Sequence, residues 1–246
     1  MRIGIDARLY HESGVGRYIR NLLNQLVELD DKNEYVVFLL NKDIDQVILP
    51  KNFQKVVADF RWYSLKEQWQ MPKLLNKYQL DLVHFPHFNV PIMYRGKYVV
   101  TIHDLIHQKV QMRRATTRDP LTYKIKQLGY GLVFETALKK SEKIITVSDF
   151  VAEELKQMWS VDGQKIVITK EAVEPAFIEL IKSTNQKLIQ QVQDKFKIDG
   201  PYLYYVGNAH PHKNVEGLIK AFDQLSKKNP KLKLVLSGHD HYFGSV

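Results

Sequence analysis

Residues 2–29 read RIGIDARLYHESGVGRYIRNLLNQLVEL and contain a strand, a turn and a helix in that order. The apolar run at residues 2–5 is followed by a turn with two glycines. The apolar side chains after it recur at the spacing of one helix face: Ile19, Leu22, Leu23, Leu26 and Leu29. A buried strand that leads into an amphipathic helix is typical of a parallel α/β sheet. This stretch therefore predicts the first strand and helix of an α/β fold.

The same alternation continues along the rest of the chain. Further strands are predicted at residues 34–40, 55–58, 80–85, 98–102, 143–147, 165–169, 201–206 and 231–236. Helices are predicted at 149–159, after the capping residue Ser148, and at 65–78, where Pro72 predicts a kink or break. Most strand runs are continuously apolar, which indicates a sheet covered by helices on both faces.

The pattern changes to a polar stretch rich in glutamine and lysine between about residues 171 and 200. We interpret residues 1–175 as an N-terminal domain, 176–200 as a linker with a helix, and 201–246 as the start of a second domain. The last segment supplies one strand, one helix and one strand, a unit that leaves both sheet faces uncovered. We therefore expect the second domain to be incomplete at residue 246.

Composition excludes several classes of site. The 246 residues contain no cysteine, which excludes disulfides, cysteine-bound metals and a thiol nucleophile and favours an interior compartment. The first residues lack the apolar core of a signal peptide, and no run reaches the ~18 apolar residues of a membrane span. We expect a cytoplasmic protein that can associate peripherally with the inner face of the membrane.

Lysine and arginine exceed aspartate and glutamate by 36 to 27, a net charge of +9, and much of this excess lies at residues 109–143. That segment has nine basic residues against three acidic ones, interleaved with apolar side chains. It predicts either docking on an anionic membrane surface, where each basic residue adds about 1 kcal/mol, or a solvated helix face. No recognition motif accompanies the charge, so nucleic acid is not an expected partner.

Two loops at predicted strand ends carry candidate binding residues. Gly14, Gly16 and Arg17 precede the first helix, whose free N–H groups favour phosphate or carboxylate. The third glycine of a dinucleotide fingerprint is absent, and a turn needed only for backbone geometry is the alternative. His103 and Asp104 end the strand at 98–102, where ligands of open α/β sheets bind; a purely structural histidine is the alternative there.

Two groups of histidines in the sequence are candidate metal sites. His84 and His87 lie at another strand end and invite a metal site with His103, but no carboxylate at a matching spacing supports it. The run GHDH at 238–241 is similar to a loop of two-metal phosphoesterases, but the partner motifs of that class do not precede it. No metal is therefore expected.

In the second domain, Asn208 follows a strand and glycine, and Lys213 supplies a point charge before a helix, which predicts a second phosphate site.

Six segments in order resemble one family: GIDAR (4–8), GVGRY (14–18), DLVHFP (81–86), VTIHDL (100–105), ITVSDF (145–150) and YVGN with KN (205–208, 213–214). They are similar to the retaining GT-B glycosyltransferases of family four, particularly bacterial mannosyltransferase-like members of polysaccharide pathways. The resemblance implies two Rossmann-like domains, of which this chain holds the first and the opening βαβ unit of the second.

The resemblance also implies an activity: transfer of a hexose such as mannose, with retention, from a GDP- or UDP-hexose to a lipid-linked or oligosaccharide acceptor. The nucleotide sugar is a substrate, and no cofactor is implied. By position, His103 and Asp104 become the catalytic pair. The residues implied to bind the donor diphosphate are Gly14, Gly16, Arg17, Asn208 and Lys213.

Two departures from the family pattern concern the second domain. Asn208 and His212 stand where many relatives have arginine. The E-x7-E segment that grips the donor sugar in relatives falls beyond Val246, so we expect an incomplete copy with little of the donor site. The alternative is a non-catalytic half that binds acceptor or glycan and needs a partner chain.

Overall fold

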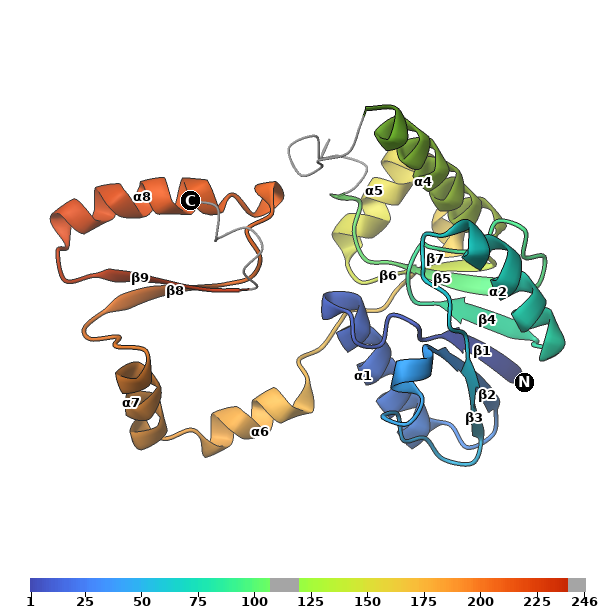
Figure 1. Ribbon diagram of the computed structural model, residues 1–246, viewed down its shortest axis with the longest axis horizontal. Coiled ribbons are helices and arrows are strands. Elements are labelled where there is room, and N and C mark those ends of the chain that lie inside the picture. The colour runs from blue at the N-terminus through green and yellow to red at the C-terminus, as the bar shows by residue number, and fades with distance from the viewer. Residues whose placement is uncertain (107–119, 239–246) are drawn as a thin grey trace. The chain divides into compact units, whose positions relative to one another are not determined.

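The computed structural model describes residues 1–106 and 120–238, which divide into two compact units (Figure 1). Among the described residues, the first unit contains 1–106 and 120–172, and the second contains 173–238. Residues 109–119 of the basic segment and 239–241 of the GHDH run lie outside the described residues. The fold class predicted from the sequence, α/β with a parallel sheet and the start of a second sheet, is confirmed.

Seven described strands form the sheet of the first unit, all parallel, in the order β3-β2-β1-β4-β5-β6-β7. Each overlaps a predicted strand, with ends that differ by at most two residues. Their bounds are β1 (Arg2–Asp6), β2 (Glu34–Leu39), β3 (Phe53–Val57), β4 (Leu82–Phe85), β5 (Tyr98–Ile102), β6 (Lys143–Thr146) and β7 (Ile166–Ile168). The strand order reverses between β1 and β4, and ligands of such sheets bind beyond the carboxyl ends of the strands at this point.

Helices cover both faces of this sheet (Figure 1). Successive strand residues point to opposite faces. Val37 of β2 therefore packs in a core cluster with Ile19, whereas its neighbour Phe38 packs in a second cluster with Met71 and Phe134. The helices are α1 (Ser13–Leu29) on the first face and α2 (Leu65–Lys77), α4 (Pro120–Lys140) and α5 (Asp149–Trp159) on the second; short 3₁₀ turns occur at Asn41–Asp43 and Gly163–Lys165.

Two helices differ from the sequence expectation. Helix α1 begins at Ser13, so Gly14 and Gly16 lie in its first turn and not in a preceding loop. Helix α2 continues through Pro72, so the break predicted there is wrong. The ring of Pro72 is buried, and this packing offsets the lost hydrogen bond of the proline. The predicted cap of α5 is confirmed, because Ser148 Oγ accepts a hydrogen bond from the Val151 N–H at 3.3 Å.

The second unit has a thinner core. Strands β8 (Tyr202–Val206) and β9 (Lys233–Ser237) pair in parallel, and α8 (Val215–Lys228) connects them after a 3₁₀ turn at Pro211–Lys213. Helices α6 (Pro175–Ser183) and α7 (Gln186–Lys195) precede them. Among the residues of 173–238 whose burial the structure describes, only Val215 is buried. In neither unit is any described helix both long and apolar enough to cross a bilayer.

Candidate functional site

Polar side chains gather at the carboxyl ends of β1, β4 and β5 in the first unit. Asp6 ends β1, Pro86 and His87 follow β4, and His103 follows β5. A pocket opens at this edge, and its walls include Asp6, Arg8, Trp62, Pro86, His87 and Asn89. Because β1 and β4 flank the reversal in strand order, the pocket occupies the place where this sheet architecture binds ligands.

A buried chain of hydrogen bonds runs beneath His103. His84 Nε2 lies 2.8 Å from Thr101 Oγ1, and the Tyr18 hydroxyl lies 3.2 Å from the same oxygen. Burial, with a smaller effect of the charge of His103, lowers the pKa of His84 to about 4, so this imidazole is neutral near pH 7. Burial also raises the pKa of Tyr18, against the effect of its hydrogen bond with Thr101. Thr101 thus links His84 to Tyr18, and Tyr18 contacts His103.

His103 is held on three sides. Its Nε2 donates a hydrogen bond to the carbonyl oxygen of Pro86 at 2.9 Å, and its Nδ1 lies 3.4 Å from Oε1 of Glu171. The ring of Tyr18 meets the imidazole edge to face at 4.9 Å. The His103 side chain is 16% exposed and that of Glu171 is 51% exposed. A ligand that binds Nδ1 must therefore displace Glu171, a partner that the sequence analysis missed.

Asp104 is exposed and turns the chain after β5. Its Oδ1 accepts a hydrogen bond from the N–H of Ile106 at 3.0 Å, the pattern of an Asx turn. This contact gives the carboxylate a structural task, and its predicted catalytic role stays a prediction.

The start of α1 brings Gly14, Gly16 and Arg17 to the same edge, because Tyr18 in the next position contacts His103. The N-cap residue Glu12 makes no side-chain hydrogen bond to the helix, and the first turn has no acidic residue. The N–H groups of this turn are therefore uncapped by side chains, at the positive end of the helix. Gly14 and Arg17 are exposed, whereas Gly16 is buried.

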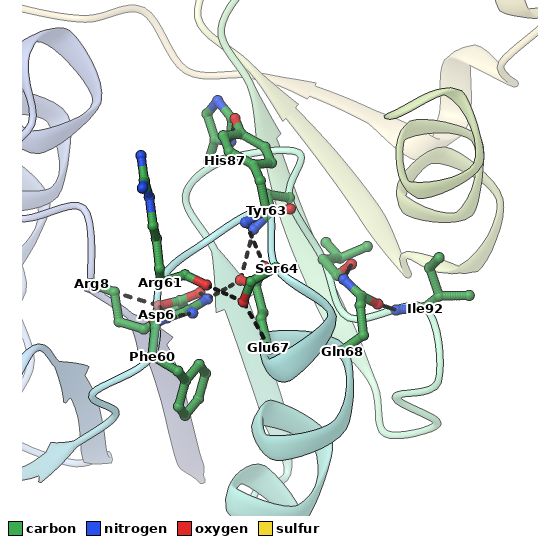
Figure 2. Close-up of polar contacts among 12 residues, drawn as sticks. Asp6, Arg8, Phe60, Arg61, Tyr63, Ser64, Glu67, Gln68, His87 and Ile92 are labelled. Atoms are coloured by element: carbon green, nitrogen blue, oxygen red, sulfur yellow. Dashed lines mark hydrogen bonds and ion pairs between the residues drawn. The ribbon is translucent and has the colours of Figure 1, made fainter. Parts of the chain in front are cut away.

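A buried ionic cluster that the sequence analysis did not predict includes Asp6 and Arg8 of the pocket wall (Figure 2). Arg8, 2% exposed, donates from Nε to Asp6 Oδ1 at 2.8 Å and from Nη2 to Glu67 Oε1 at 2.5 Å. Glu67 Oε1 also accepts from Asn89 Nδ2 at 2.7 Å, and its Oε2 accepts from the Tyr63 N–H at 2.9 Å. Burial alone would lower the pKa of Arg8, but the two carboxylates outweigh it and raise that pKa. Arg8 therefore stays charged.

One sequence signal could have pointed to Glu67. Serine at a helix N-cap followed three residues later by glutamate is a capping box. Ser64 does cap α2, accepting from the Glu67 N–H at 3.1 Å. The carboxylate, however, accepts from Tyr63, one residue earlier than in the standard box.

The remaining predicted site residues belong to the second unit. The carbonyl oxygen of Asn208 accepts from the Tyr205 hydroxyl at 2.7 Å, and its Oδ1 accepts from the His210 N–H at 3.4 Å. Lys213 is exposed at the end of the 3₁₀ turn, directly before Asn214, which caps α8. The predicted residues thus form two groups, one in each unit.

The described residues contain no group of three or more histidine, aspartate or glutamate side chains that could hold a metal ion. The three histidines considered above as a metal site each lie within hydrogen-bonding distance of protein groups: His84 of Thr101, His87 of Tyr63 and His103 of Pro86.

Residues 13–177 match the family model Glycosyltransferase Family 4, and residues 186–244 match the model Glycosyl transferases group 1. The chain belongs to glycosyltransferase family 4. This family 4 chain is 25% identical to the O-antigen chain mannosyltransferase B of Escherichia coli, in an alignment that covers 94% of this chain and 61% of that protein. The family predicted from the sequence is therefore confirmed.

Solved structures show the same GT-B fold. WaaG, a glycosyltransferase involved in lipopolysaccharide biosynthesis, is similar with a TM-score of 0.64 and 12% identity, over 100% of this chain and 66% of WaaG. The sucrose-phosphate synthase of Thermosynechococcus elongatus is similar with a TM-score of 0.61 and 17% identity, over 98% of this chain and 63% of that protein. HepE of Anabaena, solved in complex with UDP and glucose, is similar with a TM-score of 0.59 and 14% identity. The match covers 96% of this chain and 60% of HepE. The family 4 chain spans about 60% of the length of several proteins it matches.

Proposed function

We propose that this family 4 chain transfers a hexose from a nucleotide sugar to a lipid-linked or oligosaccharide acceptor, with retention and without a metal, in the synthesis of a cell-surface polysaccharide. The observation that carries this proposal is the placement of His103 beside the uncapped start of α1, at the reversal in strand order. An imidazole and free helix N–H groups at one edge suit a sugar attached to a diphosphate.

The reaction creates negative charge on the leaving group. The bond between the anomeric carbon and the diphosphate oxygen breaks, a bond from an acceptor hydroxyl to that carbon forms, and the departing diphosphate takes up the proton of that hydroxyl. Fixed donors aimed at the developing charge stabilise such a transition state. In the first unit we assign that task to the N–H group of Gly14 and to Arg17, with His103 contacting the transferred sugar and Asp104 orienting that loop. The N–H of Gly16 lies past the free first turn of α1. We therefore assign Gly16 the close approach of this helix start to the carbonyl oxygens of Leu9 and Tyr10.

In the second unit we assign diphosphate binding to Asn208 and Lys213. Lys213 is exposed and directly precedes a capped helix start, so its ammonium can meet a phosphate without losing a buried partner. Asn208 offers an amide where many relatives have a guanidinium, which leaves Lys213 as the point charge of this loop.

The substrates are proposed from relatives. The mannosyltransferase name of the Escherichia coli relative supports mannose, and the HepE structure with UDP supports a nucleotide diphosphate donor. Both the O-antigen and the lipopolysaccharide relatives support a membrane-linked glycan acceptor. A cytoplasmic enzyme that docks on the inner membrane face through the basic segment at 109–143 suits that acceptor.

The test is release of nucleotide and transfer of sugar from GDP-mannose, UDP-glucose and UDP-galactose by the 246-residue chain. We expect His103→Ala to lower turnover by about 10²-fold, and Lys213→Ala to weaken donor binding on the order of tenfold. Lys220→Ala, which removes another exposed lysine of the second unit, is the matched control and leaves both unchanged. Turnover that is insensitive to His103 would contradict the assignment.

A second candidate is a non-catalytic half that binds glycan and completes an enzyme with a partner chain. The thin core of residues 173–238 favours it, because the buried core and the described pocket both lie in the first unit. Saccharide binding without turnover of any nucleotide sugar would support this candidate over the enzyme.

A further inference from the structure

Glu171 lies directly against His103, near the end of the first unit. Its Oε1 is 3.4 Å from Nδ1 of the imidazole, and 51% of the Glu171 side chain is exposed. An ion pair with one partner this exposed adds little to stability, because solvent screens the charges and the ordered side chain loses entropy. Stability therefore does not account for this carboxylate, which points to an effect on the site itself.

The hydrogen bonds of His103 determine the charge of its ring in this contact. Nε2 donates to the carbonyl oxygen of Pro86 at 2.9 Å, and a carbonyl oxygen can only accept. An ionised carboxylate also only accepts, so Nδ1 must carry a proton as well when it binds Glu171. The imidazole is then a cation that Glu171 neutralises. The contact thus shows that the Nδ1–H of His103 is placed to hold an anionic oxygen.

The backbone around Glu171 is anchored, whereas its side chain is free to rotate. The N–H of Thr169 donates to the carbonyl oxygen of Thr146 at 2.9 Å, and Lys170 Nζ lies 2.8 Å from Asp149 Oδ2. Both contacts stay in place when the Glu171 side chain turns into solvent. Releasing the imidazole therefore requires the rotation of one half-exposed side chain and no movement of the backbone.

The charge of Glu171 also reaches the start of α1. Tyr18 of this helix meets the His103 ring at 4.9 Å. Burial is the main cause of the raised pKa of Tyr18, and the charge of Glu171 adds to it. The uncapped first turn of the same helix favours an anion, but a carboxylate nearby repels one. Binding of a diphosphate at this edge is therefore easier once Glu171 has turned away.

We propose that Glu171 is a built-in competitor of the donor: in the free chain its carboxylate occupies the Nδ1–H of His103, and the phosphate linked to the transferred sugar takes its place on binding. The choice of a diphosphate as the competing anion rests on the proposed function. Exchange of one anion for another keeps the imidazolium neutralised throughout. His103 thus carries both protons before the donor arrives.

The experiment measures binding of inorganic pyrophosphate and of UDP to the 246-residue chain by calorimetry at pH 6, where an ordinary histidine is mostly protonated. We expect Glu171→Ala to bind both probes about three- to tenfold more tightly, because a site that is blocked for most of the time loses affinity in proportion. Glu153→Ala is the matched control: it removes an exposed carboxylate paired with Lys156 and changes the net charge equally. We expect it to change the affinity by less than about twofold.

A second pair of variants shows whether His103 is the contested group. In a His103→Ala background, Glu171→Ala has no imidazolium to release, so we expect it to raise the affinity by less than about twofold. Equal gains with and without His103 would mean that the carboxylate only repels anions, which overturns the competition. The melting temperature of Glu171→Ala should equal that of the natural chain, whereas loss of a structural ion pair would lower it without tightening the binding.

The outcomes distinguish this inference from the proposed function. An affinity that stays equal or falls in Glu171→Ala overturns the inference, and so does the failure of both chains to bind either probe. Tighter binding that depends on His103, with no turnover of any nucleotide sugar, supports the inference and contradicts the enzyme proposal. Turnover that depends on His103, with an anion affinity indifferent to Glu171, overturns the inference alone.

Discussion

His84 couples stability to pH through a single buried ring. Its pKa falls from an ordinary 6.5 to about 4 on folding, so the unfolded chain binds a proton that the folded chain resists. The stability it contributes is complete above pH 6.5 and is lost as the pH falls towards 4. We expect the unfolding free energy to drop by up to about 1.4 kcal/mol per pH unit across that window. Urea titrations at pH 7 and pH 5 measure it.

His84→Gln is the comparison for that prediction, because glutamine keeps a hydrogen-bonding group near Thr101 but does not titrate. The variant should lose less stability between pH 7 and pH 5 than the natural chain. Parallel losses in the two proteins would assign the pH dependence to other groups.

Gly14 and Gly16 are equivalent in sequence and different in structure. A Cβ at Gly16 would lie 2.6 Å from the carbonyl oxygen of Tyr10 and 2.8 Å from that of Leu9, whereas a Cβ at Gly14 would meet nothing within 4 Å. We expect Gly16→Ala to destabilise the chain by about 1–3 kcal/mol and Gly14→Ala to be neutral or to stabilise α1 by up to about 1 kcal/mol. Thermal unfolding measures both effects. Equal effects would contradict the close contact between Gly16 and the carbonyl oxygens of Leu9 and Tyr10.

At the scale of elements, Glu67 joins three loops, those after β1, β3 and β4, through Arg8, Tyr63 and Asn89. Replacing it with glutamine removes one of the two carboxylates that neutralise the buried Arg8. The amide NH₂ of the glutamine would also face N–H donors that now bind a carboxylate oxygen. We expect Glu67→Gln to cost about 3 kcal/mol or more in unfolding free energy, measured by chemical denaturation.

Glu135→Gln is the control for this variant, because Glu135 forms an exposed pair with Lys139 one helical turn away in α4. Exposed pairs of this kind contribute about 0.5 kcal/mol or less. Similar losses of unfolding free energy in the two variants would show that the buried cluster contributes no more to stability than an exposed ion pair.

The elements were predictable to different degrees, for physical reasons. The strands of the first sheet were predicted correctly because a sheet covered on both faces needs continuous apolar runs. Such runs are visible in the local sequence. The start of α1 was misplaced because Gly14 and Gly16 are poor helix formers, and tertiary packing against the preceding turn overrides that preference. Pro72 continues α2 because its ring is buried, and burial is not visible in a local pattern.

The partners of the site residues were less accessible to sequence analysis than the residues themselves. His103 stands at a predicted strand end, but Glu171, which faces its Nδ1, is 68 positions later in the chain. Arg8 and Glu67 are 59 positions apart. Such pairs depend on the strand order, which no local pattern specifies, and the assignment of catalytic and diphosphate-binding roles still awaits the variants above.

At the scale of the whole molecule, the two units differ in how much of their surface is buried. Strand β5 contains Val100 and Ile102, which are fully buried, whereas most side chains of β8 are exposed. Amides exchange with solvent through local opening, which is easier where few apolar contacts must break. We expect hydrogen exchange to be faster in β8 and β9 than in β5, measured by mass spectrometry of the intact 246-residue chain. Equal protection in a monomer would contradict this expectation.

The strand order of the first sheet also has a consequence for synthesis on the ribosome. After β1 emerges, β2 and β3 add outward on one side, and β4 to β7 then add outward on the other, each next to a strand already present. None of the seven described strands has to be inserted between two that are already paired. The sheet can therefore assemble in the order of translation, but the open flank of β1 must wait until β4 leaves the exit tunnel, and an unpaired strand edge invites aggregation. Chaperone demand during translation should accordingly be highest between those two events.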